Sequence, residues 1–140
     1  MRWFFLLVGL FACTQAYAQD VEAGQRVFAR CAICHEVGPH AQNNSGPVLN
    51  KLIGRPAGAI PDYAYSAAMK ESGIVWDNER LTVFLNNPSS AVPGTKMHFA
   101  GLRSVQDIEN VITYLRQFSE DTIKPQQTLR VIHLHLSQQK

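Results

Sequence analysis

The sequence has little net charge, and this excludes one large class of proteins. Its 140 residues hold 13 lysines and arginines against 11 aspartates and glutamates, a formal charge of +2. A nucleic-acid-binding protein would need a basic stripe, which so balanced a composition does not supply. We therefore expect no nucleic acid among its partners.

The sequence also lacks an apolar run long enough to span a bilayer near its start. The run from Trp3 to Ala12 is too short for that purpose, and it follows a short positive start. Ala16-Tyr17-Ala18 matches an A-x-A cleavage site, so residues 1–18 are predicted to be a cleaved signal peptide and the protein periplasmic. The residues up to Cys13 also resemble a lipoprotein box, so a lipid anchor at Cys13 is the alternative.

Strand-rich segments and internal repeats are lacking as well. The mature chain of 140 − 18 = 122 residues fits one domain, predicted at 19–119, with a C-terminal extension at 120–140. An all-α fold is expected, and helices are predicted at 21–32, 66–73, 77–87 and 104–118. Asp20, Ser66, Asp77 and Ser104 are their predicted caps. The predicted buried stripes are Leu81, Phe84 and Leu85, then Val105, Ile108, Ile112, Leu115 and Phe118.

Two irregular segments, 36–62 and 88–103, separate these helices. The first holds glycines and prolines in loop spacing and has little periodicity. Long loops inside a compact domain are usually functional, and wrapping a cofactor is a sufficient reason for one.

What the sequence does contain is Cys31-Ala32-Ile33-Cys34-His35, the pattern of a c-type haem attachment site. Side chains three positions apart share a face of a helical turn, so both sulfurs can reach the vinyl groups of one porphyrin. The ring of His35 can then lie under the iron as its proximal ligand.

Other interpretations of the pentapeptide are weaker. A thioredoxin-like redox pair would need a βαβ setting, which is not found around residue 31. A zinc site from Cys31, Cys34, His35 and His40 would place four ligands within ten residues, unlike the usual split pairs. A disulfide between the two cysteines is the simplest structural alternative, and we favour the haem over it.

The second axial ligand of a haem decides between electron transfer and ligand or oxygen chemistry. Met97 belongs to a turn-rich loop and has no helical stripe to join, whereas packing explains Met69 in the helix predicted at 66–73. An open sixth position would instead indicate a sensor or a peroxidase. The candidates are Met69, Met97, His40, His98, His133 and His135.

From about Asp20 to Ser119 the sequence resembles class I cytochromes c, the mitochondrial type and its bacterial cytochrome c2 relatives. The interval from His35 to Met97 is 97 − 35 = 62 residues, as in that family. The matching pieces are Gly24, Phe28, the segment 31–35, Ser45-Gly46-Pro47-Val48-Leu49, Gly54-Arg55, Tyr65-Ser66, Gly73-Ile74-Val75-Trp76, Asn87-Pro88, Pro93-Gly94-Thr95-Lys96-Met97, Phe99-Ala100-Gly101 and Val111-Ile112-Thr113-Tyr114-Leu115.

The resemblance implies a small cytochrome c fold of four to five helices around one covalently attached haem c and its iron. It implies that the carbonyl of Pro47 accepts a hydrogen bond from His35, and that the thioether of Met97 is the second axial ligand. Gly24, Phe28, Tyr114 and Leu115 would join the first helix to the last. Arg55, Tyr65 and Trp76 would hydrogen-bond around the haem propionates.

The function implied is that of a soluble, monomeric periplasmic carrier rather than an enzyme. It would pass single electrons between a donor and an acceptor, expected to be membrane complexes of a respiratory or photosynthetic chain, and would take no small-molecule substrate. A haem subunit of a larger periplasmic dehydrogenase or oxidase is the alternative. Only Arg30, Lys96 and Arg103 offer positive charge around the expected haem edge, so partner docking should depend weakly on salt.

Overall fold

The computed structural model describes residues 15–119, which contain five helices and no strand. This confirms the predicted all-α class. Most of the predicted signal peptide, Cys13 with it, and the predicted extension at 120–140 lie outside the described residues. The helices are α1 (Gln15–Phe28), α2 (Ala67–Lys70), α3 (Asn78–Asn86), α4 (Pro88–Ala91) and α5 (Val105–Arg116).

Three of the predicted helix starts are confirmed by their caps. The side chains of Ser66, Asp77 and Ser104 each accept a hydrogen bond from the backbone N–H three residues later, at the starts of α2, α3 and α5. Each cap satisfies an N–H group that the first turn of a helix would otherwise leave unpaired. These local bonds explain why the starts could be predicted from the sequence.

The first helix was predicted at 21–32 behind Asp20, and both ends of that prediction are wrong. The helix α1 already begins at Gln15, because the alanines and glutamines before Asp20 favour a helix and no proline or glycine interrupts them. It ends at Phe28, where the backbone tightens. Arg30 and Cys31 donate to the carbonyls three residues back, at 3.1 and 2.7 Å, in the manner of a 3₁₀ turn.

The segment 88–103 was predicted to be a loop, but it begins with the short helix α4. Pro88 occupies its first turn, where a missing N–H costs nothing, and the side chain of Asn87 accepts a hydrogen bond from Ser90 N–H at 3.1 Å. The sequence pattern predicts only that a helix ends before Pro88, although a proline also suits the start of a helix.

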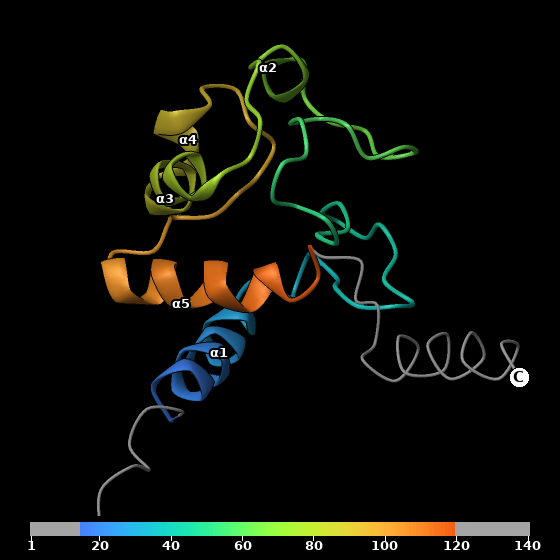
Figure 1. The fold of residues 1–140 in the computed structure, drawn as a ribbon. Coiled ribbons are helices and arrows are strands. Elements are labelled where there is room, and N and C mark those ends of the chain that lie inside the picture. The colour runs from blue at the N-terminus through green and yellow to red at the C-terminus, as the bar shows by residue number, and fades with distance from the viewer. Residues whose placement is uncertain (1–14, 120–140) are drawn as a thin grey trace, which may run out of the picture.

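The helices α1 and α5 cross and form one side of the core (Figure 1). They approach closely at Gly24, where a Cβ would lie 2.0 Å from the backbone oxygen of Asn110. The rings of Phe28 and Tyr114 pack beside this point, with centroids 5.2 Å apart. The contact implied by the family resemblance is therefore present.

The buried stripe of α5 differs from the predicted one at three positions. Phe118 lies beyond the end of the helix at Arg116 and is only half-buried. Val105 is 61% exposed, because it lies in the first turn and the core-facing side begins one turn later at Ile108. Val111 is fully buried and was missed. The stripe of α3 is confirmed, since Leu81, Phe84 and Leu85 are all buried.

The segment 36–62 is irregular, as predicted, and lies on the side of the molecule away from α3 and α4 in the view of Figure 1. Backbone hydrogen bonds fix it to the rest of the chain. Lys51 N–H donates to the carbonyl of Phe118 at 2.7 Å, and Gly54 N–H donates to the carbonyl of Trp76 at 2.7 Å. A loop held in this way can position side chains as firmly as a helix does.

Candidate functional site

The segment Cys31–His35 forms the tight helical turn that the motif predicts. The backbone N–H groups of Cys34 and His35 both donate to the carbonyl of Cys31, at 3.0 and 2.9 Å. Cys31 is half-buried against the core and Cys34 is exposed, and both thiols are free. Burial raises the pKa of the Cys31 thiol to about 11, against a smaller lowering by Arg30. Because both thiols are free, the structure contains no disulfide between Cys31 and Cys34.

His35 lies half-buried below this turn, with one ring nitrogen already bonded. Its Nδ1 is 2.7 Å from the carbonyl oxygen of Pro47. A carbonyl can only accept, so Nδ1 carries the proton and Nε2 keeps its lone pair. Burial lowers the pKa of the ring, although the bond to Pro47 acts in the opposite direction. The result is a neutral imidazole that presents one free ligand atom, as a metal-binding histidine requires.

Gly46 allows the chain to pass directly beside this ring. A Cβ on Gly46 would lie 2.5 Å from Cε1 of His35, closer than any real contact of this kind. The N–H of Gly46 also donates to the carbonyl of Cys34 at 2.8 Å. In the sequence Gly46 is distinguished only as part of a segment that matches the family, because its close approach to His35 depends on how the loop folds back.

Arg55 reaches the same loop from the other side. Its Nη1 donates to the carbonyl of Asn50 at 2.7 Å and its Nη2 to that of Val48 at 3.1 Å. A guanidinium has five N–H donors, so donors remain for an anionic group. Burial lowers the pKa of Arg55 and raises that of Tyr65, and each group moves the other's pKa by its charge, so the two lie close together.

Trp76 is 6% exposed and packs its ring on Phe84, with centroids 5.0 Å apart. Its backbone N–H donates to the carbonyl of Arg55 at 3.0 Å, which places the two residues side by side. The structure therefore brings Arg55 next to both Trp76 and Tyr65. Their role around haem propionates stays a prediction.

Met97 lies in the loop after α4, half-buried against the core cluster. Nearby, the Nζ of Lys96 donates to the carbonyl of Ala64 at 2.9 Å and holds the loop against the segment before α2. Met69 is a core residue of α2 with 8% exposure, as its predicted packing role requires. Of the histidine candidates, His40 and His98 are exposed, and His133 and His135 lie outside the described residues.

These residues fit a covalently attached haem. Two free thiols, an imidazole with an available Nε2 and a thioether are the donor set that such a group needs. A set of half-buried apolar side chains packs against the core cluster, as Cys31 and Met97 also do. The members of this set are Val37, Leu49, Ile53, Ala57, Tyr65, Ala68, Ile74 and Phe99. In residues 15–119, no three His, Cys, Asp or Glu side chains are grouped to hold a metal ion, so the zinc alternative has no support.

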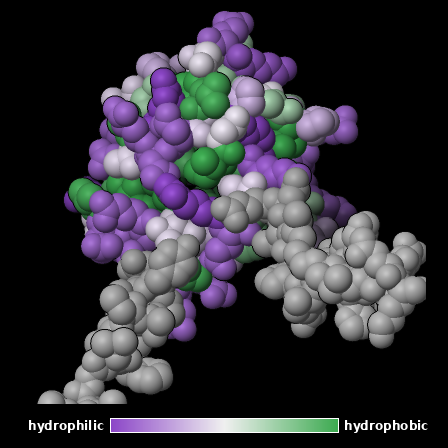
Figure 2. Space-filling view, viewed as in Figure 1, coloured by the Kyte–Doolittle hydropathy of each residue, from purple (hydrophilic) through white to green (hydrophobic). Residues whose placement is uncertain are grey.

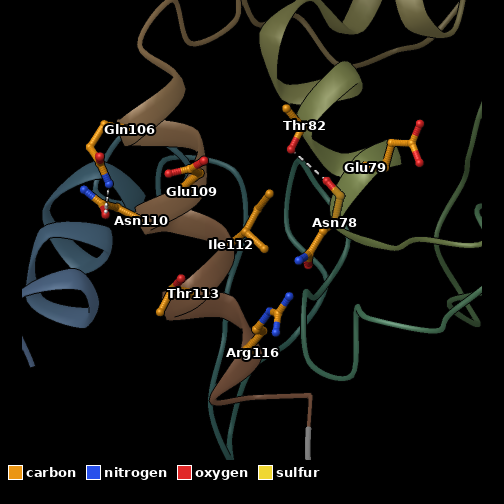
Figure 3. Close-up of a pocket in the computed structure, with 9 residues that line it drawn as sticks. All are labelled: Asn78, Glu79, Thr82, Gln106, Glu109, Asn110, Ile112, Thr113 and Arg116. Carbon is orange, nitrogen blue, oxygen red and sulfur yellow. Dashed lines mark hydrogen bonds between the residues drawn. The ribbon is translucent and has the colours of Figure 1, made fainter. Parts of the chain in front are cut away.

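A cavity of about 520 Å³ lies elsewhere, between α3 and α5 (Figure 3). Its lining is mostly polar, and two hydrogen bonds within it join Gln106 to Asn110 and Thr82 to the carbonyl of Asn78. None of the predicted haem residues lines it. The lining residues are Asn78, Glu79, Thr82, Gln106, Glu109, Asn110, Ile112, Thr113 and Arg116.

Comparisons with known proteins identify the same kind of protein as the geometry of the site does. The cytochrome c family model matches residues 21–119. Cytochrome c2 of Blastochloris viridis is 44% identical over 123 residues, which are 85% of this chain and 97% of that protein. Cytochrome c-550 of Nitrobacter winogradskyi is 45% identical over 102 residues, which cover 73% of this chain and 94% of the relative.

Among solved structures, cytochrome cH from Methylobacterium extorquens superimposes with a TM-score of 0.66 at 38% identity. The match covers 70% of this chain and 98% of that one. The chain therefore belongs to the cytochrome c family. It carries a covalently attached haem c with its iron, and Cys31 and Cys34 fit the attachment motif. No helix in residues 15–119 is long and apolar enough to cross a membrane.

Proposed function

We propose that this cytochrome c is a monomeric carrier that moves single electrons between redox proteins of the periplasm. Its haem iron would be ligated by His35 Nε2 and the sulfur of Met97. The observation that carries the proposal is the hydrogen bond from His35 Nδ1 to Pro47, because it leaves Nε2 as the free ligand atom. Residues 19–119 would form the single domain that performs this function.

The haem supplies one-electron chemistry when bound. The chain's own residues hold the iron's surroundings constant between oxidation states. The carbonyl of Pro47 fixes the tautomer of His35, and Gly46 lets the backbone support the ring. A thioether ligand such as Met97 favours a higher reduction potential than a second histidine would. Arg55, with Tyr65 and Trp76 beside it, would compensate the propionate charges.

The same ligand set argues against an enzyme. With His35 and Met97 both bound, no axial position remains for a substrate or for oxygen. We therefore propose that the protein has no catalytic activity of its own and takes no small-molecule substrate.

The haem-attachment turn offers a partner surface that carries little charge. Ile33 in this turn is 77% exposed. Only three basic residues are expected near the haem edge, and Asp107 partly offsets the charge of one of them, Arg30, at 3.9 Å. Lys96 keeps its charge, although its Nζ donates to the carbonyl of Ala64. Short-range apolar contact, rather than long-range charge steering, would hold an electron donor or acceptor here. Both partners are proposed to be redox proteins of membrane complexes.

The sparse basic charge around the expected haem edge also favours a second function, a haem subunit fixed to a larger periplasmic dehydrogenase or oxidase. Purification at native expression separates the two. A fixed subunit would remain with its dehydrogenase or oxidase through gel filtration, whereas a carrier would elute alone at the mass of one chain.

Export itself can be tested on the N-terminus. Cleavage after Ala18 would leave Gln19 as the first residue, within the part of α1 that precedes Val21. Mass spectrometry of the haem protein from the periplasm should give the mass of residues 19–140 plus one haem. A lipid-modified Cys13 would give a larger mass and would place the protein on a membrane.

The decisive test of ligation is the absorption spectrum of the haem-loaded protein, oxidised, then reduced, then exposed to carbon monoxide. A low-spin spectrum with the weak red-region band of methionine–iron ligation, and no carbon monoxide binding, is expected. Met97→Ala should abolish that band and admit carbon monoxide, whereas Met69→Leu should keep the band because Met69 is a core residue. Prompt carbon monoxide binding by the unmodified protein would contradict the carrier function.

A further inference from the structure

Two stretches of the chain lie side by side, and His35, the proposed haem ligand, belongs to the first of them. The stretch 34–38 begins at the attachment turn, and the stretch 46–50 returns beside it. Three hydrogen bonds join them in sequence order. They are Gly46 N–H to the carbonyl of Cys34 at 2.8 Å, His35 Nδ1 to the carbonyl of Pro47 at 2.7 Å, and Leu49 N–H to the carbonyl of Glu36 at 3.0 Å.

Asn50 closes the open end of this pair of stretches. Its Oδ1 accepts a hydrogen bond from Gly38 N–H at 2.8 Å, and its Nδ2 donates to the carbonyl of Gly38 at 2.7 Å. One amide side chain thus satisfies both backbone groups of Gly38. The residue is half-buried, and its own carbonyl accepts Arg55 Nη1 at 2.7 Å, which holds Asn50 from the opposite side.

We propose that Asn50 is a positioning residue for His35: its two bonds to Gly38 lock the stretches 34–38 and 46–50 in register and keep the Pro47 carbonyl on His35 Nδ1. After the Pro47 bond, the only bond between the two stretches before the pair at Asn50 is the single one from Leu49 N–H to Glu36. Val48 is held from outside the pair, since its N–H donates to Asn43 Oδ1 at 3.0 Å and its carbonyl accepts Arg55 Nη2 at 3.1 Å. This inference rests on the proposed role of His35 as an axial ligand.

The chemical consequence concerns the reduction potential. A hydrogen bond from Nδ1 makes the imidazole a stronger donor, which stabilises the ferric iron more than the ferrous iron. If Asn50 keeps this bond short, its loss should weaken the donor and raise the reduction potential. It should also expose the Nδ1 proton to exchange with solvent.

The test compares the haem-loaded Asn50→Ala variant with the unmodified protein. Its reduction potential should shift upward, and the His35 Nδ1 proton, followed by NMR in the ferrous state, should exchange faster with D₂O. The matched control is Asn110→Ala, which removes a buried amide that accepts a hydrogen bond from Gln106 at 3.0 Å inside α5. The control should lose stability but keep the potential and the exchange rate.

A second variant, Gly38→Ala, changes the other residue of the two Asn50–Gly38 hydrogen bonds. Gly38 has φ +110 and no atom within 4 Å of a built Cβ, so Gly38→Ala acts through backbone strain without a clash. It should move the potential in the same direction as Asn50→Ala. The double variant should shift it by less than the sum of the two, because both remove one shared contact. Gly38→Ala also keeps the test valid if Asn50→Ala does not take up haem.

The proposal is overturned if either variant lowers the melting temperature yet leaves the potential and the proton exchange as they are in Asn110→Ala. Asn50 would then be a structural residue only. A failure of the proposed function looks different, because the unmodified protein itself would lack the histidine–methionine spectrum. The two outcomes are therefore distinguished before any variant is made.

Discussion

At His35 the place of one proton determines what the side chain can bind. The carbonyl of Pro47, 2.7 Å away, requires the proton on Nδ1 and so leaves Nε2 available. Arg55 and Gly46 each add one constraint, the first by holding the returning stretch and the second by leaving room for the ring. Pro47, Gly46 and Arg55 therefore orient the ring of His35, the proposed axial ligand.

The Gly46→Ala substitution tests how tightly the ring is held. The added Cβ would lie 2.5 Å from His35 Cε1 and must displace either the ring or the loop. We expect a loss of about 1–3 kcal/mol in the free energy of unfolding, typical of overpacking, together with a shifted methionine–iron band. Thermal melts of the haem-loaded protein, with spectra recorded in parallel, measure both.

Gly73→Ala is the control for that substitution. Gly73 has φ +66 and no atom within 4 Å of a built Cβ, so the change adds backbone strain alone. It should lower the melting temperature and leave the spectrum unchanged. An altered band in Gly73→Ala, or an unaltered one in Gly46→Ala, would show that the close approach at His35 does not govern ligation.

Among the helices, short local bonds determine where each begins. Ser104 opens α5 by accepting the N–H of Asp107 at 3.2 Å, and α5 then carries the residues that pack on α1. A change in this cap should therefore affect the stability of the pair without affecting the haem ligands.

Ser104→Ala should lower the free energy of unfolding by about 1 kcal/mol, the usual effect of losing a serine cap. Ser104→Asp should restore most of it, since an aspartate accepts the same bond and suits the positive end of the helix. Chemical denaturation of the three proteins gives the comparison. Equal stabilities for Ser104→Ala and the unmodified protein would contradict the capping role.

The cap of α3 adds a dependence on pH. Hydrogen bonding to the backbone N–H of Arg80, with the charge of Arg80, holds the pKa of Asp77 below its usual 3.8. Because the folded pKa is depressed, this contribution to stability is fully present above 3.8 and is lost as the pH falls through the folded value.

Asp77→Asn keeps a cap oxygen but cannot titrate. We expect it to be less stable than the unmodified protein at neutral pH, and the difference should shrink as the pH falls below 3.8. Urea midpoints measured across this range test the sign. A difference that stays constant with pH would mean that the charge of Asp77 does not stabilise α3.

At the scale of the whole molecule, the net charge and the distribution of charge on the surface determine how the protein associates with other redox proteins. The formal charge of +2 includes Arg2, which the predicted signal peptide would remove. Figure 2 shows hydrophobic residues gathered in separate patches among hydrophilic ones on the face in view. Electron transfer should therefore respond weakly to ionic strength.

We expect the second-order rate of oxidation by ferricyanide to change little between low and high salt. Ile33→Lys places a positive charge on a side chain that is 77% exposed in the haem-attachment turn. It should raise the rate with this anionic oxidant at low salt, and the gain should disappear at high salt. Ile33→Gln is the control for the loss of apolar surface. A strong salt dependence in the unmodified protein would contradict the weakly charged docking surface.

Much of the protein could be predicted because its information is local. The motif at 31–35, the caps at Ser66, Asp77 and Ser104, and the apolar period of α3 each involve residues within about one helical turn. The spacing of such residues therefore predicts the attachment site and the helix starts without knowledge of the tertiary structure. The helix α4 was not predicted, because a proline can both end one helix and occupy the first turn of the next.

Other features depend on distant parts of the chain coming together. The exposure of Val105, the full burial of Val111 and the closeness of Gly24 to Asn110 follow from where α1 crosses α5. The contact of Gly46 with His35 and the amide bonds from Asn50 to Gly38 follow from a loop that folds back on itself. No periodicity encodes such contacts. The order of residues therefore specified the cofactor and the capped starts of α2, α3 and α5. The tertiary structure decided which residues support the proposed ligand His35, because hydrogen bonds across a loop form only once both sides are in place.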